Sequence, residues 1–182
     1  MFKALLGTSY FAGVDPLVLD LDGDGLELTA RTNLSPVFDL DGDGFAEQTG
    51  WVRPDDGLLV YDQNGNGQID DIGELFGSPT TSGFAELAAH DTNADGVIDA
   101  NDAIFSSLRV WQDLDQDAEV DAGELSTLSD LGIASLSLAA TPSGVEIPPT
   151  WWLKRAVFHG LMEPPAKWPM LNSVLTIMTR SG

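Results

Sequence analysis

Acidic and amide side chains recur at a fixed spacing within short segments of this sequence. Residues 91–102 and 113–124 each carry oxygen-bearing side chains at positions 1, 3, 5, 9 and 12 of a twelve-residue segment. This spacing is that of the EF-hand loop, whose same positions supply oxygen ligands to Ca²⁺. The side chains that we predict as calcium ligands in these two loops are Asp91, Asn93, Asp95, Asp99, Asp102, Asp113, Asp115, Asp117, Asp121 and Glu124.

Each of the two loops departs from the pattern at one position. Ala118 is the sixth residue of the loop at Asp113, where a positive φ would cost an alanine about 1 kcal/mol. Asp102 closes the loop at Asp91 with a shorter side chain than the usual glutamate, which favours one metal–oxygen bond over two. Both loops keep an apolar eighth residue, Ile98 and Val120.

Three earlier loops keep the first half of the pattern and lose part of the second. The loop at Asp20 has Arg31 at position 12, and the loop at Asp39 has Gly50 there. The loop at Asp62 has its glutamate one place beyond position 12. The predicted ligands in these loops are Asp20, Asp22, Asp24 and Glu27, then Asp39, Asp41, Asp43 and Glu47, then Asp62, Asn64, Asn66, Asp70 and Glu74. The alternative is that these segments are Asp-Gly and Asn-Gly hairpin turns between strands.

The charge balance favours binding of a cation over a merely soluble surface. The chain has 29 acidic and 8 basic residues, a net charge of −21. Residues 1–138 hold 27 of the acids and 4 of the bases, a net of −23, which five divalent ions would reduce to about −13. Because the empty clusters repel one another, we expect calcium to drive folding. Such a charge excludes nucleic acid and anionic membranes as partners.

The elements that would carry these loops are short strands first and loop–helix units later. Apolar runs at residues 17–19, 36–38, 57–61 and 132–138 predict strands. Helical spacing is present at residues 84–90, 102–108 and 123–131, and residues 170–178 could form a further short helix. The expected fold class is therefore α+β, with strands and hairpins followed by EF-hand-like calcium loops. A paired EF-hand sensor is disfavoured, because only ten residues separate the two best loops.

Composition excludes several other classes of site and divides the chain. There is no cysteine, so disulfides and thiolate sites are absent, and two histidines are too few for a His-rich metal site. No apolar run is long enough to span a bilayer, and no cleavable signal peptide is visible. We expect a leader at residues 1–14, a calcium-binding module at 15–138 and a Pro/Trp-rich tail at 139–182.

An Asp-Pro pair, Asp15-Pro16, stands five residues before the first loop. An aspartate carboxylate can attack its own backbone carbonyl, form a cyclic anhydride and expel the following proline nitrogen. Most Asp-Pro pairs are simple turn elements. The strings DPLVLDLDGDGLE at 15–27, GWVRPDDGLLVYDQNGNGQIDDIGELFG at 50–77 and SLRVWQDLDQDAEVDAGEL at 107–125 closely resemble the self-processing module of iron-regulated RTX proteins.

This resemblance covers residues 14–138 and is lost in the tail. It implies a Ca²⁺-triggered autocatalytic cut in which Asp15 is the internal nucleophile and new acyl terminus, and Pro16 the new N-terminus. It also implies capture of the activated Asp15 by a lysine side chain of another protein, and a secreted, extracellular location. The alternative is a calcium-stabilised structural or binding module of a secreted protein, without covalent activity.

Overall fold

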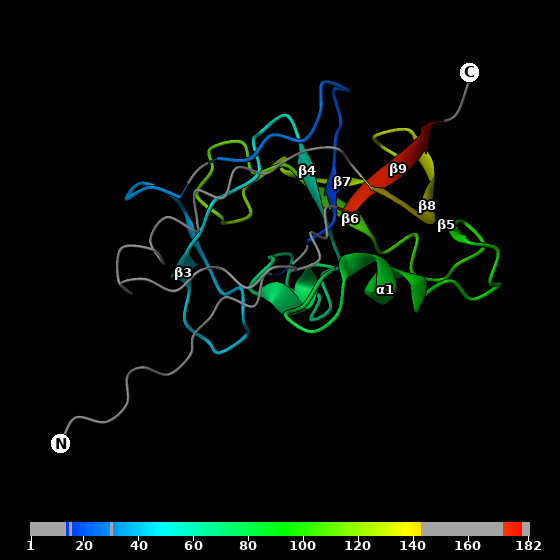
Figure 1. Ribbon diagram of the computed structural model, residues 1–182, viewed down its shortest axis with the longest axis horizontal. Helices are drawn as coiled ribbons and strands as arrows, with labels where there is room; N and C mark the ends of the chain where they lie inside the picture. Colours follow the sequence, from blue (N-terminus) through cyan, green and yellow to red (C-terminus); the bar gives the residue numbers. More distant parts are fainter. Residues whose placement is uncertain (1–13, 15, 30, 143–172, 180–182) are drawn as a thin grey trace, which may run out of the picture.

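The computed structural model describes residue 14, residues 16–29 and 31–142, and the strand at residues 173–179. Nine strands, one α-helix and one 3₁₀ turn lie in this part of the chain (Figure 1). They are β1 (Val18–Leu19), β2 (Val37–Phe38), β3 (Glu47–Gln48), β4 (Gly57–Val60), η1 (Ile72–Glu74), α1 (Gly83–Ala88), β5 (Val97–Asp99), β6 (Arg109–Trp111), β7 (Leu125–Thr127), β8 (Ile133–Pro142) and β9 (Ser173–Thr179).

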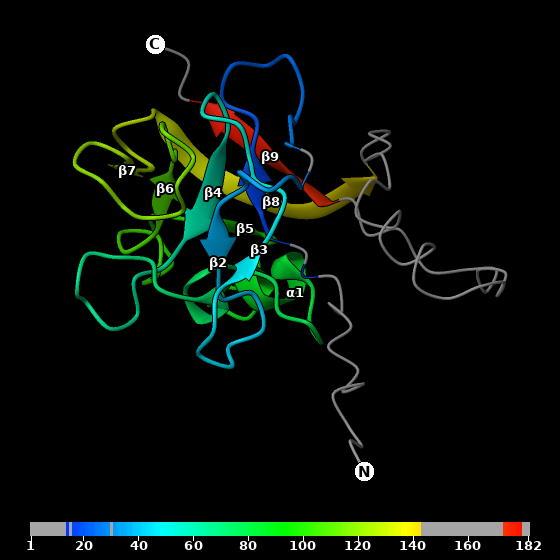
Figure 2. The ribbon, with the colours of Figure 1, turned by 90° about the vertical axis from the view of Figure 1, so that its left-hand side faces the viewer.

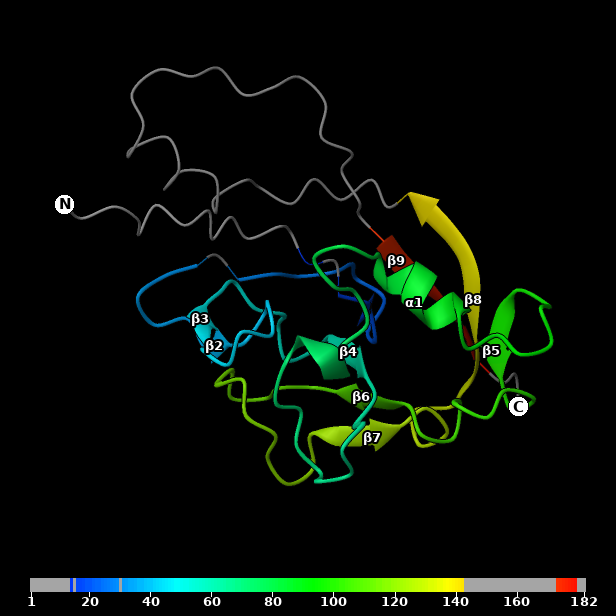
Figure 3. The same cartoon turned by 90° about the horizontal axis from the view of Figure 1, so that it is seen from below.

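Seven of the strands form one sheet in the order β5-β8-β9-β1-β4-β6-β7 (Figure 2). All neighbours are antiparallel except β1 and β9, which run parallel with Val18 opposite Val174. Strands β2 and β3 make a separate antiparallel pair to one side of β4 (Figures 1 and 3). The backbone of β9 thus inserts between β8 and β1, although its residues come from the segment that we predicted as a tail.

The central strands β1 and β4 are buried on both faces and β6 nearly so, which explains why they are apolar runs without polar alternation. One core holds Leu17, Leu19, Leu59 and Val110 together with the α1 residues Phe84 and Leu87. The other holds their strand neighbours, including Val18, Leu58, Val60 and Trp111, under the β2–β3 pair. Because successive strand residues point to opposite faces, this partition is the one that the pleat requires.

The α1 helix packs against β8 and leads directly into the loop at Asp91 (Figure 3). Ser82 caps its N-terminus, since the hydroxyl accepts a hydrogen bond from the Ala85 N–H at 3.3 Å. Phe84 and Leu87 face the core. This helix corresponds to the one predicted at residues 84–90.

The predicted α+β fold with loop–helix units is wrong, since the described residues are mostly β. Residues 102–108 make successive turns, in which the Leu108 N–H bonds the Ile104 carbonyl at 3.1 Å, without forming a helix. Residues 125–127 pair with β6 as strand β7, so strand pairing overrides the local helical spacing. The segment at 173–179 is likewise a strand.

The EF-hand-like description is wrong for the same reason. An EF-hand flanks its loop with two helices. Here the loop at Asp39 joins β2 to β3, and the loop at Asp113 joins β6 to β7. Only the loop at Asp91 follows a helix, and it continues into β5. The strands at 17–19, 36–38, 57–61 and 132–138 are present, with β8 continuing past Leu138.

Candidate metal centre

The five acidic segments share one local structure, in which the first aspartate folds the loop around its own carboxylate. The two oxygens of this residue accept N–H groups from positions 4 to 6 of the loop. The pairs at position 6 are Asp20 with Gly25 at 3.2 Å, Asp39 with Gly44 at 2.8 Å, Asp62 with Gly67 at 2.9 Å, Asp91 with Gly96 at 2.9 Å and Asp113 with Ala118 at 2.8 Å. The predicted loops are therefore five copies of one turn.

The backbone repeats as well, because positions 4 and 6 have a positive φ in every loop. Glycine fills both places in the first three loops. Ala94 takes position 4 of the fourth loop at φ 57°, and Gln116 and Ala118 take both positions of the fifth at 63°. A non-glycine residue pays strain in this region. The positive φ expected at Ala118 is confirmed, and the same demand at position 4 was not foreseen.

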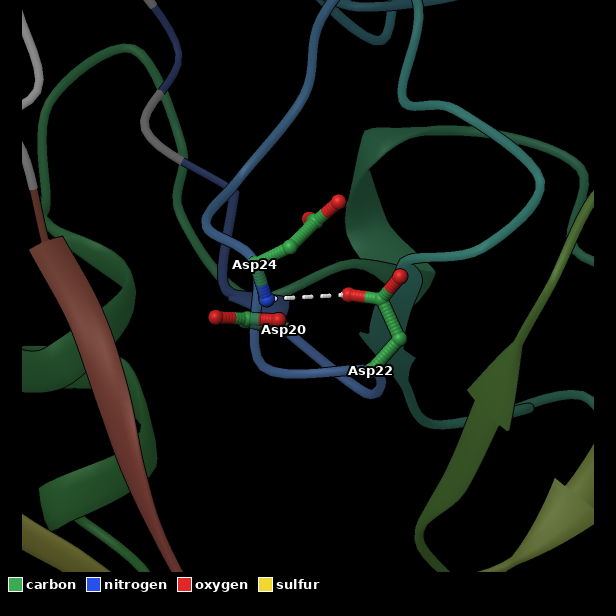
Figure 4. Close-up of side chains that lie close together, drawn as sticks. All are labelled: Asp20, Asp22 and Asp24. Atoms are coloured by element: carbon green, nitrogen blue, oxygen red, sulfur yellow. Dashed lines mark hydrogen bonds between the residues drawn. The ribbon is translucent and has the colours of Figure 1, made fainter.

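Three of the loops bring carboxylates close enough to share one ion. Oxygens within 4.8 Å of one another belong to Asp20, Asp22 and Asp24, to Asp39, Asp41 and Asp43, and in the fifth loop to Asp113, Asp115 and Glu124 and to Asp115, Asp117 and Asp121. Figure 4 shows the first group, with the Asp24 N–H donating to Asp22 Oδ1 at 3.1 Å. A side-chain hydrogen bond with Asp22, followed by the charge of that carboxyl, raises the pKa of Asp24. A divalent cation would relieve the repulsion between the two carboxylates.

A second carboxylate closes each of the last three loops from inside the protein. Glu74, Asp102 and Glu124 are buried, at 5%, 3% and 3% exposure. Each accepts an N–H from the second loop residue and another from the ninth. The donors are Gln63 and Asp70 for Glu74, Thr92 and Asp99 for Asp102, and Leu114 and Asp121 for Glu124, at 2.7 to 3.1 Å. Glu74, the thirteenth residue of the third loop, thus has the role that the twelfth residue has in the fourth and fifth loops.

The second loop is closed by Glu47, from its ninth position. Burial, followed by the charges of Asp41 and Asp43, raises the pKa of Glu47, while the N–H of Leu40 lowers it. Leu40 is the second residue of that loop. The Oε2 atom of Glu47 is buried without a hydrogen-bond partner. Four of the loops therefore set a carboxylate against the N–H of their second residue.

The first loop does not use Glu27 in this way. Glu27 Oε2 lies 3.6 Å from Arg53 Nε, outside the Asp20 group. The carboxylate beside the loop is instead Asp56, which is 1% exposed and accepts the Glu27 N–H at 2.8 Å. Asp56 lies 36 residues after Asp20, and the spacing rule had no means of finding it.

The third and fourth loops gather fewer charges. Asn64 and Asn66 turn their amide NH₂ groups toward Asp70 Oδ2, at 3.2 and 2.7 Å. Asn93 donates in the same way to Asp95 at 2.8 Å. These loops have the shared turn and the closing carboxylate, but no group of three close carboxylates within the described residues. Their oxygens still suit a hard cation such as Ca²⁺ or Mg²⁺.

Two tryptophans brace the fifth loop from the core. Trp51 Nε1 donates to Asp113 Oδ2 at 2.6 Å, and Trp111 Nε1 donates to Glu124 Oε2 at 3.4 Å. The two indoles meet edge to face at 5.6 Å between ring centroids, and Phe38 packs on both. Since Phe38 precedes Asp39, this cluster connects the second loop to the fifth. The sequence offered no spacing signal for these contacts.

The Asp-Pro pair is only partly described. Asp15 lies outside the described residues, and Pro16 is half-buried. Leu17, which follows, is fully buried, and its N–H donates to the Phe76 carbonyl at 3.2 Å while its carbonyl accepts the Leu59 N–H at 2.9 Å. The chain immediately after Pro16 is thus held on two sides.

A cavity of about 360 Å³ adjoins this strand start through Phe76. Its wall includes three side chains able to exchange a proton: Tyr61, Glu86 and His90. The Glu86 carboxylate accepts the Gly77 N–H at 2.7 Å, and the His90 ring stands edge-on to Phe76 at 6.2 Å. These acid–base groups share the cavity with Phe76, whose carbonyl accepts the Leu17 N–H.

The fold and the site together define a mostly β domain whose strands are joined by repeated carboxylate-folded loops. The SPM domain family matches residues 17–155, so the chain belongs to that family. It is also 52% identical, over 134 residues, to Iron-regulated protein FrpA from Neisseria meningitidis serogroup C. That alignment takes in 69% of this chain and 12% of the relative, so the chain spans a small part of the relative's length.

The family match begins directly after Pro16 and continues past Leu138. The division into leader, module and tail stays a prediction. Within the part of the chain that is described, no helix is both long and apolar enough to cross a membrane.

Proposed function

We propose that this chain is a calcium-dependent self-processing domain of an iron-regulated RTX-type protein, which cleaves its own Asp15–Pro16 bond. The observation that carries the proposal is the short connection from the bond to the first loop. Pro16 is followed by Leu17, which is tied into the sheet, and β1 ends directly before Asp20. Ordering of the loop by a cation therefore orders the chain on the proline side of the bond.

Calcium is the cation that the loops fit best. Their donors are carboxylate, amide and backbone oxygens, which are hard ligands, and three loops crowd carboxylates within 4.8 Å of one another. The sites lie at loop tips whose backbone is held by N–H bonds to the first aspartate. When bound, calcium would neutralise the crowded charges and stabilise the folded chain relative to the unfolded one.

The cleavage uses groups of the chain alone. The Asp15 carboxylate forms a bond to its own carbonyl carbon, and the bond from that carbon to the Pro16 nitrogen breaks. The nitrogen takes up a proton and becomes a secondary amine, and the acyl part closes as a cyclic anhydride. Water then opens the anhydride to restore Asp15 as a free C-terminus, or a lysine ε-amine of another protein opens it and forms an amide.

The proton for the leaving nitrogen requires a donor near Pro16. Tyr61, Glu86 and His90 line the cavity beside Phe76, whose carbonyl binds Leu17, so we take them as the candidate donors. The likeness of the sequence to the RTX self-processing module supports the cut, the lysine acceptor and an extracellular location of the parent protein. A purely structural calcium module is the competing function.

One experiment separates these two functions. The full chain is incubated with EDTA or with millimolar Ca²⁺, and its intact mass is followed. Self-processing predicts loss of residues 1–15 only with calcium, a fragment beginning at Pro16, and no loss in the Asp15→Ala variant. With a lysine peptide present, part of the 1–15 fragment should gain the mass of that peptide less water. Calcium binding without any fragment would establish the structural module instead.

A further inference from the structure

Asp56 is a buried carboxylate that the spacing of the acidic loops does not include. It is 1% exposed, its Oδ2 accepts the Glu27 N–H at 2.8 Å, and its Oδ1 is buried without a hydrogen-bond partner. An unpaired carboxylate oxygen inside a protein is costly unless a cation or a donor reaches it. The fold therefore maintains Asp56 in a place that its hydrogen bonds alone do not account for.

The surrounding turn holds Asp56 against the first loop at two points. Residues 53–56 form a β-turn with Pro54 at its second place, closed by the Asp56 N–H on the Arg53 carbonyl at 3.1 Å. The Arg53 N–H donates to the Glu27 carbonyl at 3.1 Å, and the Glu27 N–H donates to Asp56. Gln112 Nε2 binds the Pro54 carbonyl at 3.2 Å from the other side. The turn is thereby fixed against the loop.

Asp56 approaches the first loop from inside the protein, as the closing carboxylates approach the last three loops, although its oxygens are not among those of Asp20, Asp22 and Asp24 that lie within 4.8 Å of one another. Glu74, Asp102 and Glu124 accept N–H groups from loop positions 2 and 9. Asp56 accepts the N–H of Glu27, which is position 8. Burial raises the pKa of Asp56, as do the charges of Asp20 and Asp55, while the N–H groups of Glu27 and, less strongly, of Leu21 at position 2 lower it.

We propose that Asp56 is the closing ligand of the first cation site, supplied from a separate turn to complete the set Asp20, Asp22 and Asp24. Glu27 does not fill this role, because its side chain is directed to Arg53 and its N–H serves Asp56. Arg31, at the twelfth place of the loop, is a cation and cannot be a ligand. The inference rests on the proposed function, since it deepens the calcium site that precedes the cleaved bond.

A role for Asp56 as the proton donor in cleavage is disfavoured by distance. The register places Leu19 opposite Gly57, so Asp56 lies next to Asp20 across the strands. Pro16 is four residues back along an extended strand, about 13 Å away. Asp56 therefore acts on the bond only through the loop, as a positioning residue.

The test compares Asp56→Asn with Asp55→Asn in the full chain. Asp55 is exposed and one residue away, so its variant removes the same charge without removing a proposed ligand. Calcium titration by calorimetry should show that Asp56→Asn loses one site, or weakens it at least tenfold, as Asp20→Asn does. The double variant Asp20→Asn, Asp56→Asn should lose no more than either alone, and Asp55→Asn should stay within about twofold of the wild type.

A purely structural role predicts a different result. The asparagine oxygen can still accept the Glu27 N–H, so loop bracing alone would leave calcium stoichiometry and affinity unchanged and overturn the proposal. Failure of Asp56→Asn to fold in saturating calcium, where Asp20→Asn folds, would overturn it also. Binding is read independently of cleavage, so wild-type protein that binds calcium without losing residues 1–15 would count against the proposed function and leave the Asp56 assignment standing.

Discussion

Trp51 Nε1 lies 2.6 Å from Asp113 Oδ2, so an indole from the segment after β3 binds the first carboxylate of the fifth loop. Both side chains are buried, Trp51 at 4% and Asp113 at 0% exposure. A hydrogen bond of this kind fixes the carboxylate and compensates part of its desolvation. The bond also connects the core beneath β2 and β3 to the fifth loop.

Replacing Trp51 with phenylalanine keeps an aromatic ring and removes the donor. We expect the free energy of unfolding in calcium to fall by about 1 to 3 kcal/mol, because a buried carboxylate loses a charge-assisted hydrogen bond. Urea unfolding monitored by circular dichroism measures this change. Trp111→Phe is the matched control, with a longer bond of 3.4 Å to Glu124, and should cost less. Equal losses would show that ring packing, and not the bond, is responsible.

Ala94 has a φ of 57° at an exposed position of the fourth loop. We expect Ala94→Gly to stabilise the calcium-bound protein by up to about 1 kcal/mol, because glycine relieves the left-handed strain. Ala103→Gly is the control, since Ala103 is also exposed but has no positive φ. It should be neutral or destabilising. A loss of stability in Ala94→Gly would mean that the gain in unfolded-chain entropy outweighs the strain.

Removal of calcium should unfold much of the domain. The crowded carboxylates of the first, second and fifth loops are left uncompensated, and the Phe38–Trp51–Trp111 cluster depends on the second and fifth. Circular dichroism and tryptophan fluorescence are compared in excess EDTA, in millimolar Ca²⁺ and in equal Mg²⁺. Identical spectra in EDTA and Ca²⁺ would contradict coupled binding and folding. Recovery by Mg²⁺ as complete as by Ca²⁺ would contradict selectivity for calcium.

Without calcium, stability should depend on pH in a defined direction. Burial raises the pKa of Glu47 and of Asp56, so these groups bind more protons in the folded than in the unfolded chain. Any residual apo stability should therefore fall as pH rises from the ordinary carboxyl range near 4 toward neutrality. Urea midpoints in EDTA at about pH 5 and pH 7 test this, with the higher midpoint expected at the lower pH.

The pKa shift of Asp102 changes stability with pH in the opposite direction. The Thr92 N–H and hydroxyl lower its pKa, so its contribution to stability is present above the ordinary carboxyl pKa and is lost as pH falls through its folded-state pKa. We therefore expect the apo midpoint to decrease again in stronger acid. Thr92→Val removes the hydroxyl donor at 2.8 Å and should weaken that acid-side loss. A urea midpoint that keeps rising as the pH is lowered to about 3 would contradict this assignment.

Local sequence rules predicted the position of each acidic loop and several of the strands. The spacing of Asp, Asn and Gly determines where each loop begins and which residues turn, because the first carboxylate bonds N–H groups only three to five residues away. The apolar runs predicted strands β1, β2 and β4, and helical spacing predicted α1. The same rules failed at 102–108, which makes successive turns, and at 123–131, where residues 125–127 pair with β6 as strand β7.

Only the tertiary structure decided how the loops are closed and braced. Asp56 reaches the first loop from a turn beyond β3, and Trp51 reaches Asp113 across 62 positions of the chain. No periodicity records such contacts, because they arise from sheet register and core packing and not from neighbouring residues. The sequence by itself determined the turns that can gather oxygen ligands. The fold determined which buried groups complete them, since a carboxylate remains charged inside a protein only where donors or a cation meet it.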